Sequence, residues 1–298
     1  MKQSVYEKIT AKIVADLEAG VRPWMKPWSA EHAAGRITRP LRSNGIPYRG
    51  INIVMLWMQA MDRGYAAPIW MTFKQALELG GHVRKGEHGT LVVYADTITR
   101  TDTNEKTGEE SESVIPFMKG YTVFNVEQIE GLPAQYHALA EAPLDPVQRI
   151  ERAEAFFAAI GASIITGGNM ACYSVSHDHI RMPPFETFRD AEGYYATLAH
   201  ECVHWTRHPS RLDRDLGRKR WGDAGYAAEE LVAELGAAFL CADLELTPEV
   251  RDDHASYIAS WLKVLKDDPR AIFTAASHAQ RAADYVNAFT GNRAAQAA

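Results

Sequence analysis

Apolar residues at helical spacing open the chain. They recur over 5–17 behind Ser4 and Glu7, which have the spacing of a capping box, and Gly20 follows them. This pattern predicts a helix that ends at Gly20. The next stretch, 21–50, is too rich in Pro and Gly for regular structure and carries many Arg, Trp and Tyr residues. We expect an irregular loop there that presents cations and aromatic rings.

Two more helices and a hairpin are predicted in the rest of the N-terminal part. The apolar positions favour a helix around 51–61 and a short one over 72–79. The segments TLVVYADTIT (90–99) and VIPFMKGYTVFNV (114–126) are typical of the two arms of a β-hairpin. Their connection, TDTNEKTGEESES, is acidic and polar, and we expect it to be mobile. These elements predict a small α+β domain over residues 1–135.

The pattern breaks within 131–145, which we interpret as a linker. Asp145 as N-cap and Pro146 at the first helical position then begin a new helix. Strands are predicted at SIIT (163–166) and at ACYSVSHDHIRM, and helices follow nearly to the end of the chain. A second domain over 145–298 is therefore expected, and the whole chain is assigned to the α+β class.

The composition fits two folded domains in the cytoplasm. A chain of 298 residues, 46% of them hydrophobic, can bury a sizeable core. No apolar run approaches the length of a membrane span, and the first residues do not resemble a signal peptide. The three cysteines form no Cys-x-x-Cys pair, which indicates reduced thiols. We expect a cytoplasmic protein with no membrane partner.

Charge is distributed unevenly along the chain. Residues 1–95 carry 13 Lys and Arg against 7 Asp and Glu, whereas the remaining residues carry 19 against 31. A basic N-terminal part and an acidic C-terminal part indicate different partners for the two.

The stretch LAHECVHWT, residues 198–206, carries candidate chemistry. His200 and His204 lie one turn apart on a predicted helix, so both imidazoles can reach one metal ion. Glu201 is close enough to reach a metal-bound water without binding the ion. This is the H-E-x-x-H signature, in which the carboxylate serves as general base. The alternative is a solvated helix face with no metal.

A second predicted helix, YAAEELVAELGAAFLC, offers the third ligand that a catalytic zinc needs. Apolar helices rarely bury unpaired carboxylates, because desolvating the charge is costly. The segment EELVAE resembles the Asn-Glu-x-x-Ser-Asp pattern of gluzincin metallopeptidases. The resemblance places Glu230 at the metal ligand and Glu234 at a carboxylate that orients a ligand histidine. Glu229 replaces the Asn of the pattern, so Glu229 and Glu230 remain alternatives; a surface helix with scattered glutamates is another.

Longer motifs resemble the ArdC-type antirestriction proteins over almost the whole chain. HECVHWTRHPSRLDR, YAAEELVAELGAAFL and DHIRMPP are similar to the C-terminal metallopeptidase domain of that family. RPWMKPW, YRGINIVMLW and WMTFKQALELGGHVRKGEHGTLVVYA resemble its N-terminal single-stranded-DNA-binding domain. The resemblance implies a plasmid-encoded protein that shields incoming DNA from restriction. It also implies a zincin-like fold, similar to SprT-type proteases, behind a small DNA-binding domain.

The residues of the N-terminal part are suited to single-stranded DNA. Sequence-tolerant binding needs cations that follow the phosphates and flat side chains on which bases stack. No basic recognition helix or finger motif is present, which argues against duplex readout. The alternative for the tryptophans beside prolines is a role as core anchors. The candidate contacts are Arg22, Trp24, Lys26, Trp28, Arg36, Arg39, Arg42, Tyr48, Arg49, Trp70, Arg84 and Lys85.

The predicted function is an antirestriction protein that binds single-stranded DNA and carries a metal-dependent protease domain. Zinc is the expected ion, with Mn²⁺ or another divalent ion as the alternative at a His₂Glu site. Restriction components or DNA-bound proteins are the expected substrates. One alternative is a DNA-binding shield whose metal site cleaves nothing, and another is a SprT-like protease acting on DNA-bound proteins. His177, His179 and Tyr226 are weaker candidates for polarising a carbonyl, and His208 only loosely resembles a third metal ligand.

Overall fold

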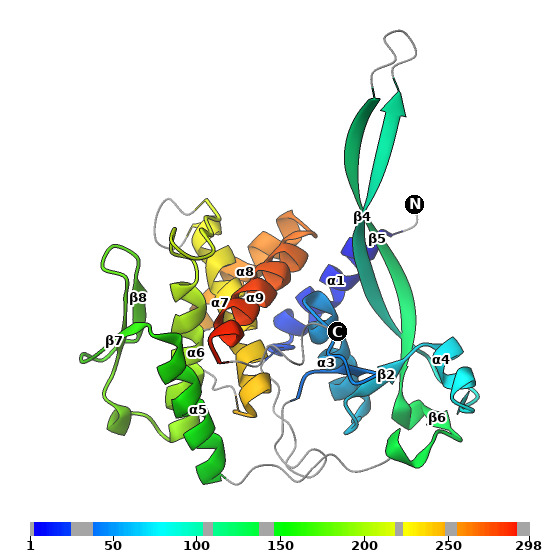
Figure 1. The fold of residues 1–298 in the computed structure, drawn as a ribbon, viewed down its shortest axis with the longest axis horizontal. Helices are drawn as coiled ribbons and strands as arrows, with labels where there is room; N and C mark the ends of the chain where they lie inside the picture. The colour runs from blue at the N-terminus through cyan, green and yellow to red at the C-terminus, as the bar shows by residue number, and fades with distance from the viewer. Residues whose placement is uncertain are drawn as a thin grey trace.

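The computed structural model describes residues 3–24, 38–103, 110–136, 146–217, 223–247 and 255–290. Helices α5 to α9 gather on one side of the molecule, and a long hairpin projects from the other side (Figure 1). Helices α1 and α3 of the N-terminal part lie between them. This arrangement confirms the predicted mixture of helices and sheets. No helix among the described residues is both long and apolar enough to cross a membrane.

The N-terminal helices lie where the sequence predicts them. α1 (Val5–Glu18) starts at a capping box in which Ser4 and Glu7 satisfy each other's backbone N–H groups. α3 (Ile51–Arg63) ends at Gly64, whose left-handed backbone conformation favours glycine. α4 (Phe73–Glu78) is a short helix behind the cap Thr72. The three predicted helices are therefore present.

The hairpin is longer than the alternation of side chains predicts. β4 (Thr90–Thr103) and β5 (Glu110–Asn125) pair antiparallel from Thr90↔Val123 to Thr103↔Glu110. The connection expected over 101–113 is therefore shorter, because residues at both of its ends belong to the strands. Main-chain hydrogen bonds continue the ladder without an apolar face, and the threonines there favour extended backbone. The segment 104–109 lies outside the described residues.

Short strands complete the N-terminal part. β1 (Leu41–Arg42) lies within the stretch expected to be irregular and pairs parallel with β2 (Ile69–Met71). The resulting sheet has the order β1-β2-β5-β4. β3 (His82–Val83) and β6 (Ile129–Glu130) form a separate pair. Short 3₁₀ helices lie at Val126–Gln128, Ala134–Tyr136, Phe185–Thr187 and Ala288–Thr290.

The described residues of the C-terminal part form five α-helices and a small sheet. β7 (Ser163–Thr166) and β9 (His179–Met182) are parallel, and β8 (Cys172–Ser174) runs antiparallel to β9 at one edge. The single strand predicted over 171–182 is thus two strands around a turn. Asp178 in that turn has a φ of 48°, a conformation that few residues other than Gly, Asn and Asp adopt. The helices are α5 (Pro146–Ile160), α6 (Ala191–Trp205), α7 (Ala224–Leu244), α8 (Ala255–Asp267) and α9 (Ala271–Asn287).

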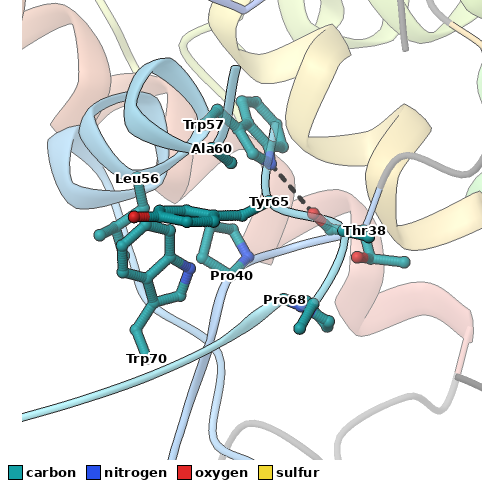
Figure 2. A pocket seen from close by; sticks show the side chains of 10 residues that line it. Thr38, Pro40, Leu56, Trp57, Ala60, Tyr65, Pro68 and Trp70 are labelled. Carbon is teal, nitrogen blue, oxygen red and sulfur yellow. Dashed lines mark hydrogen bonds between the residues drawn. The ribbon is translucent and has the colours of Figure 1, made fainter. Parts of the chain in front are cut away.

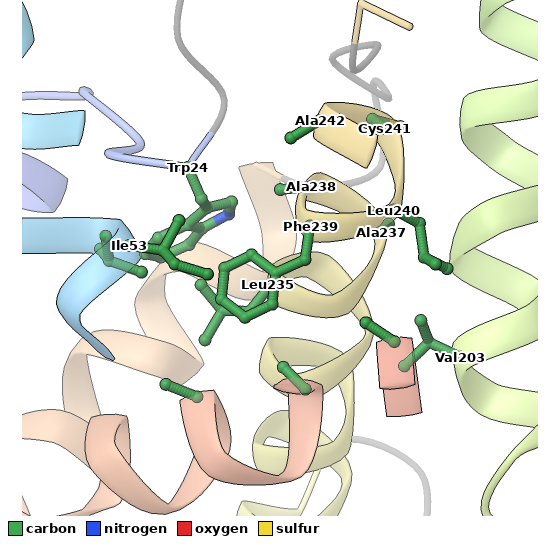
Figure 3. Close-up of a cluster of buried hydrophobic side chains, with 14 of the residues drawn as sticks. Trp24, Ile53, Val203, Leu235, Ala237, Ala238, Phe239, Leu240, Cys241 and Ala242 are labelled. Carbon is green, nitrogen blue, oxygen red and sulfur yellow. The ribbon is translucent and has the colours of Figure 1, made fainter. Parts of the chain in front are cut away.

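One hydrophobic core joins the two parts of the chain. Trp24 and Ile53 of the N-terminal part pack beside α7 residues such as Leu235 and Phe239 (Figure 3). Ion pairs add to this interface, for example between Lys266 on α8 and Glu18 on α1 at 2.6 Å. The division into domains over 1–135 and 145–298 stays a prediction. The described residues of both parts nevertheless bury their apolar faces against each other.

Candidate metal centre

The candidate metal centre lies between α6 and α7. The two helices approach closely at Gly236, where an added Cβ would lie 2.7 Å from a methyl carbon of Val203. A larger residue would push the helices apart, so the glycine lets side chains from both helices meet. Each helix is fixed at its start by an aspartate cap, Asp190 for α6 and Asp223 for α7.

Three donor atoms from these helices face one another. His200 Nε2 lies 3.1 Å from His204 Nε2. Glu230 Oε2 lies 3.5 Å from His200 Nε2 and 3.6 Å from His204 Nε2. Three atoms bound tetrahedrally to one ion at about 2.0–2.1 Å would be about 3.3–3.4 Å apart. The triangle therefore has the dimensions of a His₂Glu site for one divalent ion, and these residues form the metal-competent group found among the described residues.

A carboxylate holds the far nitrogen of each histidine. Glu234 Oε1 lies 3.4 Å from His200 Nδ1, and Glu229 Oε1 lies 3.1 Å from His204 Nδ1. Because a carboxylate accepts hydrogen bonds, each Nδ1 is the donor, and in the neutral ring each Nε2 presents a lone pair to the centre. Three facing acceptors repel one another unless a cation sits between them. The geometry thus favours Glu230 over Glu229 as the ligand.

Arg214 is a member of this site that sequence reasoning missed. Its Nε and Nη2 donate to the two oxygens of Glu229, both at 2.8 Å. Further bonds reach Thr206 Oγ1 at 3.0 Å and the Val203 carbonyl at 2.9 Å. Both Arg214 and Glu229 are buried, so the pair is desolvated and rigid. Arg214 is one of several arginines in the irregular segment after α6, and no spacing rule ties it to a glutamate on α7.

The electrostatics of the centre favour a positive charge. Burial by itself lowers the pKa of both histidines, but the carboxylates outweigh it. Glu230 and Glu234 raise the pKa of His200, and Glu230 with Glu229 raises that of His204 to about 10. Burial raises the pKa of Glu229, yet Arg214 and His204 lower it to about 2. The group therefore binds protons strongly, and a metal ion would take their place.

Comparisons with known proteins give the family. Residues 3–124 match the N-terminal domain of anti-restriction factor ArdC, and residues 151–278 match a zincin-like metallopeptidase. The crystal structure of the metal-free antirestriction protein ArdC from the R388 plasmid is 51% identical with a TM-score of 0.81, over 97% of this chain and 99% of that one. The chain belongs to the ArdC family of antirestriction proteins.

Three further comparisons extend this picture of the ArdC-family chain. The Mn(II)-bound structure of the R388 protein is 48% identical with a TM-score of 0.79, over 98% of this chain and 100% of that one. The uncharacterised protein y4eC of Sinorhizobium fredii is 48% identical over 86% of this chain and 83% of its own length. DNA primase TraC of Escherichia coli is 40% identical over 83% of this chain but only 24% of TraC. The zincin-like match and the Mn(II)-bound relative both point to a divalent metal at the His₂Glu group.

Glu201 and Tyr226 also adjoin the ligands of this ArdC-family site. Glu201 follows His200 on α6, is buried, and its charge acts on His200. Tyr226 shares a hydrogen bond of 2.8 Å with the hydroxyl of Tyr257, and it contacts Glu230. His177 contacts Ser174 and Ser176, and His208 contacts Ser210. These contacts tie His177 and His208 to their own turns rather than to the ligand group.

The structure buries three of the predicted stacking rings. Trp24 and Trp70 are each 1% exposed and Tyr48 is 3% exposed, so no base can lie on them as they stand. Trp70 lies in the wall of a small apolar pocket beside Tyr65 and Trp57 (Figure 2). For these rings the structure favours the alternative role of core anchors.

The predicted cations differ in their burial and in their ion-pair partners. Arg39 is buried and donates to Asp243 at 2.7 Å, and Arg49 pairs with Asp284. Arg84 pairs with Glu87 at 2.9 Å. Arg42 and Lys85 are exposed, and the guanidinium of Arg42 lies over the ring of Tyr48. Arg22 is half-buried, and Lys26, Trp28 and Arg36 lie outside the described residues.

Proposed function

We propose that this ArdC-family chain binds single-stranded DNA through its N-terminal part and hydrolyses peptide bonds at the α6–α7 site, protecting incoming DNA from restriction. The observation that carries the hydrolase part is the triangle of His200, His204 and Glu230, each histidine held by its own carboxylate. Glu201 stands beside this triangle without belonging to it. The His₂Glu donor set favours zinc, and the Mn(II)-bound relative supports manganese as the alternative.

The residues have separate roles in the proposed reaction. A bound divalent ion would polarise the peptide carbonyl and lower the pKa of water towards about 7. Glu201 accepts a proton from the attacking water and delivers it to the leaving amine nitrogen. The new C–O bond forms at the carbonyl carbon as the C–N bond breaks. Glu229 and Glu234 keep the histidine rings in one orientation during these steps.

A second function, a DNA-binding shield that cleaves nothing, is favoured by the burial of the site. The side chains of His200, His204 and Glu230 expose only 6–12% of their surface. A peptide substrate needs a free approach to the reacting centre, whereas an ion that stabilises the fold does not.

The variant Glu201→Gln separates the two functions. It removes the base, keeps the ligands and lies far from Arg42 and Lys85 in sequence. We expect it to retain the metal and lose hydrolysis. The decisive measurement is the transfer of unmodified plasmid into a restricting host. Full protection by Glu201→Gln would refute proteolysis as the mechanism, whereas lost protection at unchanged DNA affinity would refute the shield.

DNA binding is tested at the exposed cations. Each phosphate contact contributes about 0.7 to the slope of log affinity against log salt for single strands. We expect Arg42→Ala and Lys85→Ala to flatten this slope in the full chain. Lys266→Ala, on the acidic C-terminal part, is the matched control and should leave the slope unchanged. Equal slopes for all three variants would show that these residues do not contact DNA.

A further inference from the structure

Trp24 connects the N-terminal part to the metal centre. Its indole Nε1 donates a hydrogen bond of 3.4 Å to Glu234 Oε2, and the other oxygen of that carboxylate faces His200 Nδ1. Trp24 is 1% exposed, so water does not compete for this bond. Figure 3 shows the ring beside α7 with its nitrogen turned towards that helix. One carboxylate thus joins a ligand histidine of α6 to a tryptophan from the other part of the chain.

The position of Trp24 is determined by its neighbours as well as by this bond. Its ring meets Trp261 of α8 edge-on, with centroids 5.8 Å apart. Trp261 is itself fixed, because its Nε1 donates to the Ala227 carbonyl of α7 at 3.1 Å. The indole N–H is therefore held by packing before it meets Glu234. A donor in a fixed place selects one orientation of the carboxylate and, through it, one orientation of the His200 ring.

We propose that Trp24 is a positioning residue of the metal centre, which acts through Glu234 to orient His200. This inference rests on the proposed role of His200, His204 and Glu230 as ligands. Trp24 was predicted to stack on DNA bases. The inference instead gives it a structural role at the metal centre of the C-terminal part. It also makes the metal centre incomplete without the N-terminal part of the chain.

The test compares Trp24→Phe with Trp57→Phe in the full chain. Trp57 is a buried tryptophan of the N-terminal part whose Nε1 donates to the Thr38 carbonyl at 3.0 Å instead of to Glu234. Mn²⁺ affinity is measured from the electron paramagnetic resonance signal of the free ion. We expect Trp24→Phe to weaken binding by about tenfold, the lower end for partners that orient a ligand. Trp57→Phe should stay within about twofold of wild type, because its lost hydrogen bond does not involve Glu234 or a ligand histidine.

A double-mutant cycle with Glu234→Gln distinguishes positioning from packing. Trp24 and His200 face different oxygens of Glu234, and in Gln one of these oxygens is replaced by an NH₂ group that cannot accept a hydrogen bond. In that background Trp24→Phe should cause no further loss, and it should restore some affinity. Additive losses would mean that Trp24 acts by packing alone and would overturn the proposal. The d–d absorption of bound Co²⁺ should shift in Trp24→Phe and stay unchanged in Trp57→Phe.

Two further outcomes are decisive. If Trp24→Phe does not fold, benzothienylalanine at position 24 replaces it, because this isostere keeps the ring and lacks only the N–H. Unchanged Mn²⁺ affinity with that residue, or with Trp24→Phe, would refute the positioning role. Failure of the wild-type protein to bind Mn²⁺ would instead refute the proposed ligand group.

Discussion

Replacing Arg214 with methionine tests whether its hydrogen bonds to Glu229 contribute to stability and to metal affinity. Methionine fills much of the same volume but donates no hydrogen bond. It removes both bonds to Glu229, together with those to Thr206 and Val203. The Glu229 carboxylate, with 1% of its side chain exposed, then keeps its contact with His204 Nδ1.

Two effects of different size follow from this change. Breaking a buried ion pair by removing one partner costs about 3–5 kcal/mol of unfolding free energy. The loosened Glu229 also orients His204 less well, which lowers metal affinity about 10–100-fold. The first effect is measured by urea unfolding in the presence of a chelator, and the second by metal titration of the folded protein. Arg211→Met is the control, because Arg211 pairs with Asp178 and does not contact Glu229.

The double variant Arg214→Met/Glu229→Met separates the effect on stability from the effect on metal affinity. It removes the unpaired buried charge, so stability should recover relative to Arg214→Met alone. Metal affinity should not recover, since His204 still lacks its carboxylate. Metal affinity within twofold of wild type in Arg214→Met would refute the idea that Glu229 orients His204 with the help of Arg214. A loss of the same size in Arg211→Met would show that the assay reports general destabilisation.

Three other measurements check separate parts of the structure. Gly236→Ala should destabilise the fold by about 1–3 kcal/mol through overpacking against Val203 and weaken metal binding, and adding Val203→Ala should restore the binding. A chelator should lower the unfolding temperature of the metal-loaded protein by several degrees, because an ion at about 1,000 times its Kd contributes about 4 kcal/mol; an unchanged temperature would argue against a bound ion. Asp178→Asn tests a pH effect. The bond from Arg211 holds the pKa of Asp178 at about 2, so the stability contributed by this carboxylate is present above about pH 4 and is lost as pH falls through 2. The aspartate is partly exposed, so the loss at pH 7 should be about 1 kcal/mol or less and should shrink towards pH 2; a constant difference would contradict this.

The elements with strong periodicity and clear caps were predictable. α1, α3 and α6 follow from their apolar spacing and cap residues, and the His200/His204 pair follows from helical geometry alone. The outer ends of β4 and β5 were not predictable in the same way. Their pairing is carried by backbone hydrogen bonds along a polar sequence, which leaves no hydrophobic pattern to detect.

The metal centre also combines features that were predictable from the sequence with features that were not. The sequence alone left Glu229 and Glu230 as alternatives, because adjacent residues on a helix differ by only 100° and the axis of α7 relative to α6 was unknown. Arg214 and Trp24 lie outside regular helices, far in sequence from the carboxylates they contact. Contacts of this kind depend on tertiary packing, so no local sequence pattern predicts them.

The uneven charge of the chain is explained in part by contacts within the molecule. Arg39 and Arg49 belong to the basic N-terminal part, and both pair with aspartates of the acidic C-terminal part, Asp243 and Asp284. Each pair neutralises one cation and one anion within the molecule. From the sequence alone, these charges were assigned to separate partners. Complementary charge across the shared core therefore supplies part of what seemed a signature of DNA binding. Among the described residues, the exposed Arg42 and Lys85 remain candidates for contact with a phosphate backbone, and such contacts would make the affinity for DNA depend on salt.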